Sequence, residues 1–231
     1  HRPRLAWSQL CYGNGLRLTD NEAYKSVLLN GAQSLSTRFN PTVGAIKSWD
    51  PGVGPYTFPV IIDNMMNLEL MMWAAREGPA DRYRDLAIRH ADTTLAHHFR
   101  ADHSTVHVVD YDPTTGQVIK RVTHQGTSDD SAWARGQAWG LYGYTVMYRE
   151  TKDPRYLAQA QQIAAFVMHH PRLPADKVPY WDFDDARIPN APRDSSAAAI
   201  ICSALLELRG YAAPDLAADY TAFAEAQLRS L

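Results

Sequence analysis

Arginine, glutamine and tryptophan are concentrated in one short stretch of the chain, residues 124–140. On a helix, Trp133 and Gln137 fall on one face, and Arg135 and Trp139 fall on another, because residues four apart are neighbours. A tryptophan ring can stack on a sugar, and an arginine can donate two parallel hydrogen bonds to a carboxylate. The stretch therefore predicts a pocket for an acidic sugar. A buried helix with internally satisfied polar groups is the alternative.

The surrounding chain predicts how this stretch is held. Ser128, Asp129 and Asp130 are favourable N-caps, so we expect the helix to begin near them and to run to about Thr151. Residues 61–75 are apolar nearly all round, which indicates a helix buried on all sides. Residues 106–111 and 117–122 change to short strands around a turn, which predicts a β-hairpin.

A repeat organises the rest of the chain. An early tyrosine opens each of four Ala/Leu-rich amphipathic helices, at intervals of roughly 65 residues; these tyrosines are Tyr24, Tyr83, Tyr156 and Tyr220. A more apolar helix precedes each one. The pattern predicts α/α hairpins with buried inner helices, amphipathic outer helices, and functional loops at the N-terminal ends of the inner helices. A ring of six such hairpins needs on the order of 390 residues, so a full ring would be open here.

Composition excludes several classes of protein. The 23 basic and 25 acidic residues leave no basic stripe for nucleic acid or a membrane surface, and no apolar run approaches the ~20 residues that span a bilayer. Cys11 and Cys202 fit neither a disulfide framework nor a metal site, and we expect both to be buried free thiols. Low cysteine content and the absence of a signal pattern favour the cytoplasm, with the periplasm left open. The ends at His1 and Leu231 suggest a fragment.

Several segments together resemble the unsaturated glucuronyl hydrolases, a glycoside hydrolase family 88-like group. The similar segments are residues 44–49, 61–68, 107–112, 124–126, 133–140 and 193–197, in the family's order. The resemblance implies an all-α fold, an α/α toroid of six hairpins that is incomplete here, with a small β-hairpin insertion. It also implies one catalytic domain over residues 1–231.

The family acts on oligosaccharides left by polysaccharide lyases, whose terminal uronic acid carries a C4–C5 double bond. The resemblance implies hydration of this vinyl ether, followed by loss of the sugar, without a metal or other cofactor. The expected ligand is thus an unsaturated uronyl di- or oligosaccharide. Its parent polysaccharide and the oligomeric state of the protein are not predicted.

The resemblance also implies individual roles. Asp63 is similar to the family's acid/base aspartate, and helix N-capping is its alternative role. His107 matches an active-site histidine that could orient the aspartate or contact the sugar. Further substrate-binding residues are implied for carboxylate pairing, hydrogen bonding and stacking; these are Arg135, Gln125, Trp133, Trp139 and Trp49.

One segment departs from the family. Upstream of Gly13 the family places a His-Asp-x-Gly-Phe motif with a second site carboxylate, and this chain has no acidic residue before Asp20. Either that segment is missing or altered, or the position has changed. Two alternatives to a glucuronyl hydrolase follow: an unsaturated rhamnogalacturonyl hydrolase, and a non-catalytic carbohydrate-binding remnant. An enzyme would turn over the unsaturated sugar, whereas the remnant would only bind it.

Overall fold

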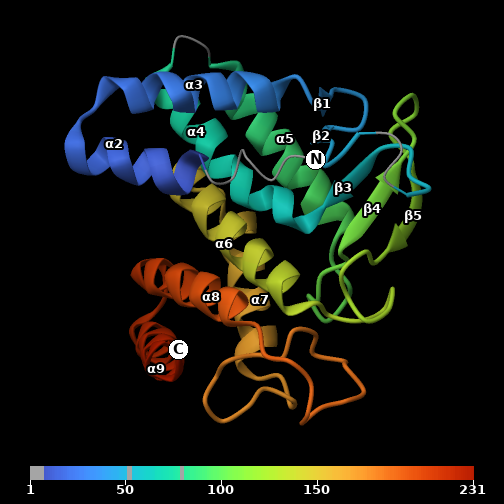
Figure 1. Ribbon diagram of the computed structural model, residues 1–231, viewed down its shortest axis with the longest axis vertical. Coiled ribbons are helices and arrows are strands. Elements are labelled where there is room, and N and C mark those ends of the chain that lie inside the picture. The colour runs from blue at the N-terminus through green and yellow to red at the C-terminus, as the bar shows by residue number, and fades with distance from the viewer. Residues whose placement is uncertain (1–7, 51–53, 79–80) are drawn as a thin grey trace.

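The computed structural model describes residues 8–50, 54–78 and 81–231, and most of them are helical (Figure 1). The helical elements in chain order are the π-helix η1 (Ser8–Gly13), α2 (Asn14–Thr19), α3 (Glu22–Ser36), the 3-10 helix η2 (Ile62–Asn67), α4 (Leu68–Glu77), α5 (Arg82–His97), α6 (Ala134–Thr151), α7 (Pro154–Met168), α8 (Ser195–Leu208), the 3-10 helix η3 (Arg209–Tyr211) and α9 (Pro214–Ser230). The segment in which the second carboxylate was expected, residues 1–7, lies outside the described residues.

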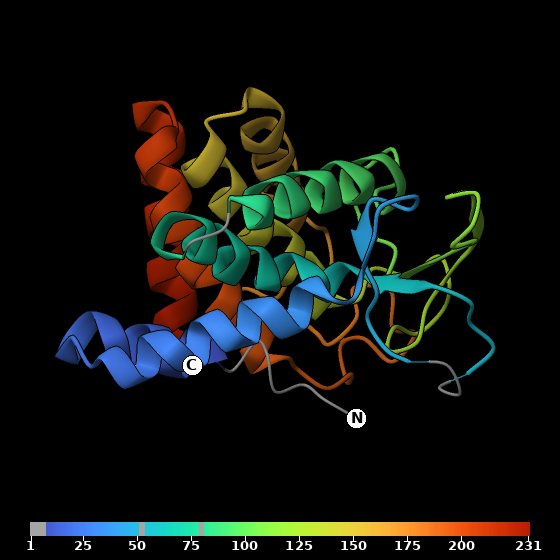
Figure 2. The same cartoon turned by 90° about the horizontal axis from the view of Figure 1, so that it is seen from above.

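The helices pack as sequential antiparallel pairs: α2 with α3, α4 with α5, α6 with α7, and α8 with α9. Figure 2, seen from above, shows these pairs following one another round the molecule. The repeating tyrosines of the last three pairs are buried in the core and anchor each second helix; they are Tyr83, Tyr156 and Tyr220. The four amphipathic helices predicted from the repeat are therefore present. Their ends follow local signals such as Asp153, which caps α7 through the Arg155 N–H.

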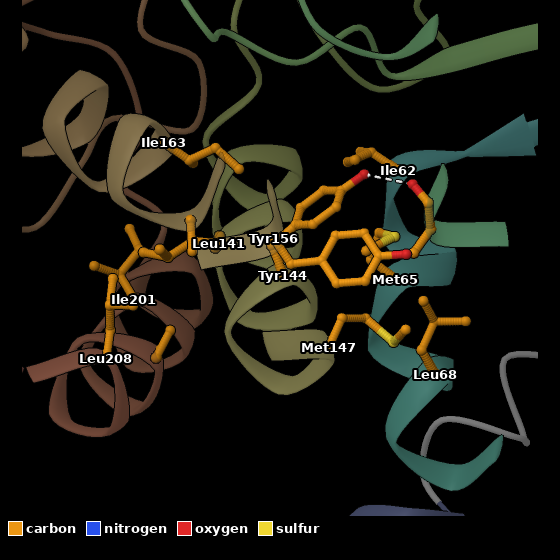
Figure 3. Packing of buried hydrophobic residues seen from close by; sticks show 14 of the residues in the cluster. Ile62, Met65, Leu68, Leu141, Tyr144, Met147, Tyr156, Ile163, Ile201 and Leu208 are labelled. Carbon is orange, nitrogen blue, oxygen red and sulfur yellow. Dashed lines mark hydrogen bonds between the residues drawn. The ribbon is translucent and has the colours of Figure 1, made fainter. Parts of the chain in front are cut away.

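Helix α6 lies at the centre of the hydrophobic core. Figure 3 shows its side chains between those of η2 and α4 on one side and those of α7 and α8 on the other. The buried residues that meet there are Ile62, Met65, Leu68, Leu141, Tyr144, Met147, Ile163, Ile201 and Leu208. Because η2 carries Asp63, this packing places the 3-10 helix against a rigid neighbour.

Gly143 permits the close contact between α6 and η2. A Cβ atom at this position would lie 2.4 Å from the Cβ of Met65 and 3.0 Å from its carbonyl oxygen. Gly143→Ala should therefore lower the free energy of unfolding by about 1–3 kcal/mol, because a well-packed core cannot absorb an extra methyl group. Chemical denaturation measures this loss. Gly210→Ala is the control, since a Cβ there meets nothing within 4 Å; equal stability of the two variants would contradict the packing argument.

The β-structure is larger than the expected hairpin. Strands β4 (Val108–Tyr111) and β5 (Val118–Val122) form that hairpin, and β3 (Pro59–Ile61) extends it to a three-stranded antiparallel sheet in the order β3-β4-β5. The register pairs Ile61 with Val108. Strands β1 (Phe39–Asn40) and β2 (Ala45–Ile46) form a second, two-stranded sheet. The fold is thus mainly helical with two small sheets, and β3 leads directly into η2.

Two local predictions were wrong. Helix α6 begins at Ala134 with Trp133 as its N-cap, so Ser128, Asp129 and Asp130 lie in the preceding loop instead of capping it. Cys202 is buried as expected, but Cys11, which lies on η1, is exposed. None of the helices in the described ranges is long and apolar enough to cross a membrane.

Candidate active site

The sheet and the N-terminal ends of α4, α6 and α8 lie on the same side of the molecule (Figure 1). Asp63 enters this region in the first turn of η2, immediately after β3. Hydrogen bonds hold nearby residues on both sides of it. The Ile61 N–H donates to Ser48 Oγ at 2.8 Å, and Asn64 Nδ2 donates to the Ile46 carbonyl at 2.7 Å. The chain around Asp63 is therefore held from outside the 3-10 helix.

The carboxyl group of Asp63 is poised as an acid. The residue is 8% exposed, and burial raises the pKa of the carboxyl group to about 7, against the opposing effects of a hydrogen bond from its own backbone and the charge of Arg135. No described residue donates a hydrogen bond to Oδ2. The N-cap of η2 is Ile61, so N-capping does not explain Asp63. A buried carboxyl group that has one oxygen without a hydrogen-bond partner and is half protonated near neutral pH is suited to general acid–base chemistry.

His107 faces Asp63 in a defined protonation state. Its Nδ1 accepts hydrogen bonds from the backbone N–H groups of His124 and Gln125, at 3.0 and 3.1 Å. Since a nitrogen that accepts two N–H groups carries no proton, the proton of the neutral ring lies on Nε2. That Nε2 is 3.8 Å from Asp63 Oδ2. Burial, with a smaller effect from His124, lowers the pKa of His107 to about 3, so the ring is neutral at physiological pH.

Trp133 and Arg135 continue the site onto α6. The ring of Trp133 is buried and lies 4.8 Å from that of His107, centroid to centroid. The guanidinium carbon of Arg135 lies 5.1 Å from the centre of the Trp133 ring, and its Nε donates to Asp194 Oδ2 at 3.2 Å. Asp194 in turn caps α8 by accepting from the Ala197 N–H at 2.8 Å. The Arg135 side chain is 40% exposed, which leaves its Nη groups accessible to a ligand.

Trp49 and His124 border the same region. Their rings are 5.6 Å apart, and the His124 ring lies 6.3 Å from that of His107. Tyr56 supports Trp49 through an edge-to-face contact at 5.3 Å. Rings therefore continue from the buried Trp133 to the partly exposed Trp49.

The structure brings together Asp63, His107, Trp133 and Arg135, with Trp49 reached through His124. Gln125 is exposed, and it contacts the site through its backbone N–H, which donates to His107. Trp139 is half-buried and packs edge-to-face on Tyr142 at 5.9 Å, one turn along α6 from Arg135.

Some of the residues that hold this site were not assigned to it from the sequence. Ser48 and Asn64, which hydrogen-bond each other, are the sequence neighbours of Trp49 and Asp63. This adjacency was the feature of the sequence that could have indicated them. Asp194 lies in the family-like segment 193–197, but nothing in the sequence paired it with Arg135. The alternative of internal satisfaction describes Gln137 only in part. This residue is fully buried and its Nε2 donates to Thr105 Oγ1 at 2.8 Å, but its Oε1 accepts no hydrogen bond from the described residues.

The described residues contain no group of three histidine, cysteine, aspartate or glutamate side chains placed to hold a metal ion. Asp63 and His107 face each other without a third such side chain. The expectation of a reaction without a cofactor stays a prediction.

Comparisons with known proteins give consistent matches. No protein-family model matches the chain. An unsaturated glucuronyl hydrolase of Formosa agariphila is 52% identical over 201 residues, which cover 87% of this chain and 50% of that protein. An unsaturated chondroitin disaccharide hydrolase of Streptococcus pyogenes is 38% identical over 184 residues, 80% of this chain and 46% of that protein. The chain thus spans about half the length of these curated relatives.

The fold matches in the same way. The crystal structure of an unsaturated glucuronyl hydrolase specific for heparin aligns with a TM-score of 0.92 at 50% sequence identity. The alignment covers 97% of this chain and 60% of that one. Both the sequence and the arrangement of helices and sheets are therefore shared over nearly the whole of this chain.

Proposed function

This chain belongs to the unsaturated glucuronyl hydrolase family, and we propose that the protein of which it forms part removes a terminal 4,5-unsaturated uronic acid from lyase-generated oligosaccharides. The names of the relatives support this substrate class. The observation that carries the proposal is the Asp63 carboxyl group, which is buried, has a raised pKa and faces a neutral histidine beside an arginine and a tryptophan.

The proposed reaction needs one carboxyl group for two proton transfers. Protonated Asp63 donates its proton to C4 of the vinyl ether, and positive charge develops at C5, stabilised by the ring oxygen. The Asp63 carboxylate then takes a proton from the water that adds to C5. The resulting hemiketal opens to a ketone, and the hemiacetal left at C1 releases the remaining sugar. One water molecule is consumed, and Asp63 returns to its acid form.

The neighbouring side chains divide binding between them in this proposal. The Nη groups of Arg135 pair with the uronate carboxylate, because a planar guanidinium can donate two parallel hydrogen bonds. His107 donates its Nε2–H towards Asp63 or the sugar, and Gln125 hydrogen-bonds a sugar hydroxyl. Stacking on the sugar rings is assigned to the three tryptophans of the region, Trp49, Trp133 and Trp139.

The architecture of the whole protein belongs to the same proposal. The four helical hairpins of this chain would form part of a six-hairpin α/α toroid, within a single catalytic domain. Such a ring places the entry loops of the inner helices at one end, which is where Asp63, Arg135 and Asp194 lie here.

Reaction in deuterium oxide tests the hydration step. If Asp63 delivers the proton, the product should carry deuterium on a single face of C4, seen by proton NMR at early times. Direct hydrolysis at C1 would release an unsaturated sugar that loses its double bond in solution, with deuterium on both faces. That second result would contradict the mechanism.

The pKa of Asp63 predicts the pH dependence of the reaction. Only the protonated carboxyl group can donate to C4, and with a pKa of about 7 its protonated fraction should fall about tenfold between pH 6 and pH 8. We therefore expect kcat/KM to fall by that factor over this range, measured from initial rates in buffers of constant ionic strength. A value of kcat/KM that stays constant or rises across the range would show that the acid form of Asp63 is not required.

A further inference from the structure

The buried carboxylate of Asp182 has no part in the chemistry described so far. The residue is 0% exposed and lies in the long segment between α7 and α8. Its Oδ2 accepts hydrogen bonds from the Thr127 N–H at 2.9 Å and from Ser131 Oγ at 2.7 Å. Its Oδ1 accepts from the Asp184 N–H at 2.9 Å. Three donors from two segments therefore converge on one carboxylate.

No described lysine, arginine or histidine forms an ion pair with Asp182, in contrast to Asp194, which binds Arg135. A buried charge without a cation is costly unless hydrogen bonds replace the lost water. Such a group holds its donors in one arrangement, because any movement leaves the carboxylate unsatisfied. We interpret Asp182 as a constraint on the loop that donates to it.

The loop preceding α6 is held by hydrogen bonds to the segment that carries Asp182. Backbone bridges tie it to the segment of Asp182: the Phe183 N–H donates to the Ala132 carbonyl, and the Ala134 N–H donates to the Trp181 carbonyl, both at 3.0 Å. Asp184 Oδ2 accepts from the Ala132 N–H at 2.9 Å. Residues 181–184 therefore hold the loop at Thr127 and at residues 131–134, while Arg100 holds it at the Asp129 and Ser131 carbonyls.

The same loop determines which nitrogen of His107 carries the proton. The two N–H groups that meet Nδ1 belong to His124 and Gln125. Residue 127, bound to Asp182, follows after one glycine, and a Cβ atom on that glycine, Gly126, would lie 3.1 Å from Asp182 Oδ2. A displacement of the Asp182 side chain would therefore also displace residues 124 and 125.

We propose that Asp182 is a positioning residue, which holds the loop of residues 124–131 so that two backbone N–H groups keep His107 in the tautomer that presents its Nε2–H to Asp63. The catalytic consequence rests on the function proposed above, whereas the tautomer itself does not. Asp182 acts on the reaction only through the loop and His107.

Asp182→Asn is the informative change. The amide has the size of the carboxylate but can offer an oxygen to only one side, so its NH2 group must face N–H donors on the other. The loop should then move, and the Nδ1–H tautomer of His107 should become populated. Asp110→Asn is the matched control, because Asp110 is equally buried and accepts from the N–H groups of Thr57 and Phe58, away from this loop.

Long-range proton–nitrogen NMR of the histidine rings reads the tautomer directly, with the signals of His107 assigned by their loss in His107→Gln. The unchanged protein and Asp110→Asn should show a protonated Nε2 and an unprotonated Nδ1. Asp182→Asn should shift both nitrogen signals towards a mixture. If it does not fold, Ser131→Ala, which removes one donor to Asp182, should give a smaller shift in the same direction.

The outcomes separate this inference from the proposed function. In an active protein, kcat of Asp182→Asn should fall about 10- to 100-fold, whereas KM should rise by a smaller factor, because Arg135 stays in place and only Gln125 among the proposed binding residues lies in the loop. An unchanged His107 tautomer in folded Asp182→Asn or Ser131→Ala would overturn the inference while leaving the activity standing. A shifted tautomer in a protein that consumes no unsaturated sugar would uphold the inference and reject the function.

Discussion

Replacing Asp63 with asparagine should lower kcat at least ~1,000-fold and leave the affinity for an unsaturated uronyl disaccharide nearly unchanged. General acid–base catalysis by a positioned side chain contributes about 10²- to 10⁴-fold, and here one group performs both transfers. Asparagine keeps the shape of aspartate but can neither donate the proton to C4 nor accept one from water. Initial rates give kcat, and calorimetric titration of the inactive variant gives the dissociation constant.

Unfolding would not explain that loss. Burial raises the pKa of Asp63 from 3.8 in the unfolded chain to about 7 in the folded protein. The free energy of unfolding therefore falls as the pH rises between these two pKa values, because the unfolded chain loses the proton first. Asp63→Asn has no such charge and should be at least as stable at pH 8. Asp85→Asn, on the exposed surface of α5, serves as the activity control. More than a tenth of the original kcat in Asp63→Asn would remove Asp63 from the acid role.

Replacing Arg135 with lysine should raise KM about 10- to 100-fold. A hydrogen bond to a charged group contributes about 1.5–3 kcal/mol, and each 1.4 kcal/mol is tenfold in affinity. Lysine keeps the positive charge but cannot donate two parallel bonds to the uronate carboxylate, and it also loses the Nε bond to Asp194. Saturation kinetics with one disaccharide measure the change.

Two comparisons make this prediction specific. Arg187→Lys is a control, since the Arg187 side chain is 61% exposed and pairs with Asp185 instead of a residue of the site. The methyl ester of the substrate supplies the second comparison. Because the ester carries no charge, the native protein should bind it weakly, and Arg135→Lys should bind it with the same affinity. If the acid and the ester lose affinity equally on substitution, then Arg135 does not recognise the carboxylate.

The helices were the most predictable part of the fold. Their caps are local in sequence: Asp153 and Asp194 each accept a hydrogen bond from an N–H group two or three residues later. The start of α6 was wrong because Asp129 has another donor within reach. Its Oδ1 accepts from the Thr123 N–H at 2.7 Å, and the residue therefore closes a loop instead of opening a helix. A sequence lists possible caps without ranking the donors available to each.

Strand β3 and the bonds of the site could not be predicted for a different reason. Three residues beginning with Pro59 have no strand pattern of their own, and they are extended because β4 pairs with them. The bonds from Arg135 to Asp194 and from Thr127 to Asp182 join residues 59 and 55 positions apart. Resemblance named Asp63, His107 and Arg135, but their mutual geometry depends on such long-range contacts.

The most direct test follows the ultraviolet absorbance of the C4–C5 double bond in unsaturated uronyl disaccharides derived from glycosaminoglycans and from rhamnogalacturonan. The substrates are incubated with this chain and with a version extended at both ends to the length of its relatives. We expect the extended chain to consume a glucuronyl disaccharide and to release one sugar for each double bond lost. Binding without loss of absorbance in either form would contradict hydrolysis and favour a carbohydrate-binding protein, and consumption of the rhamnogalacturonan disaccharide alone would assign the other hydrolase family.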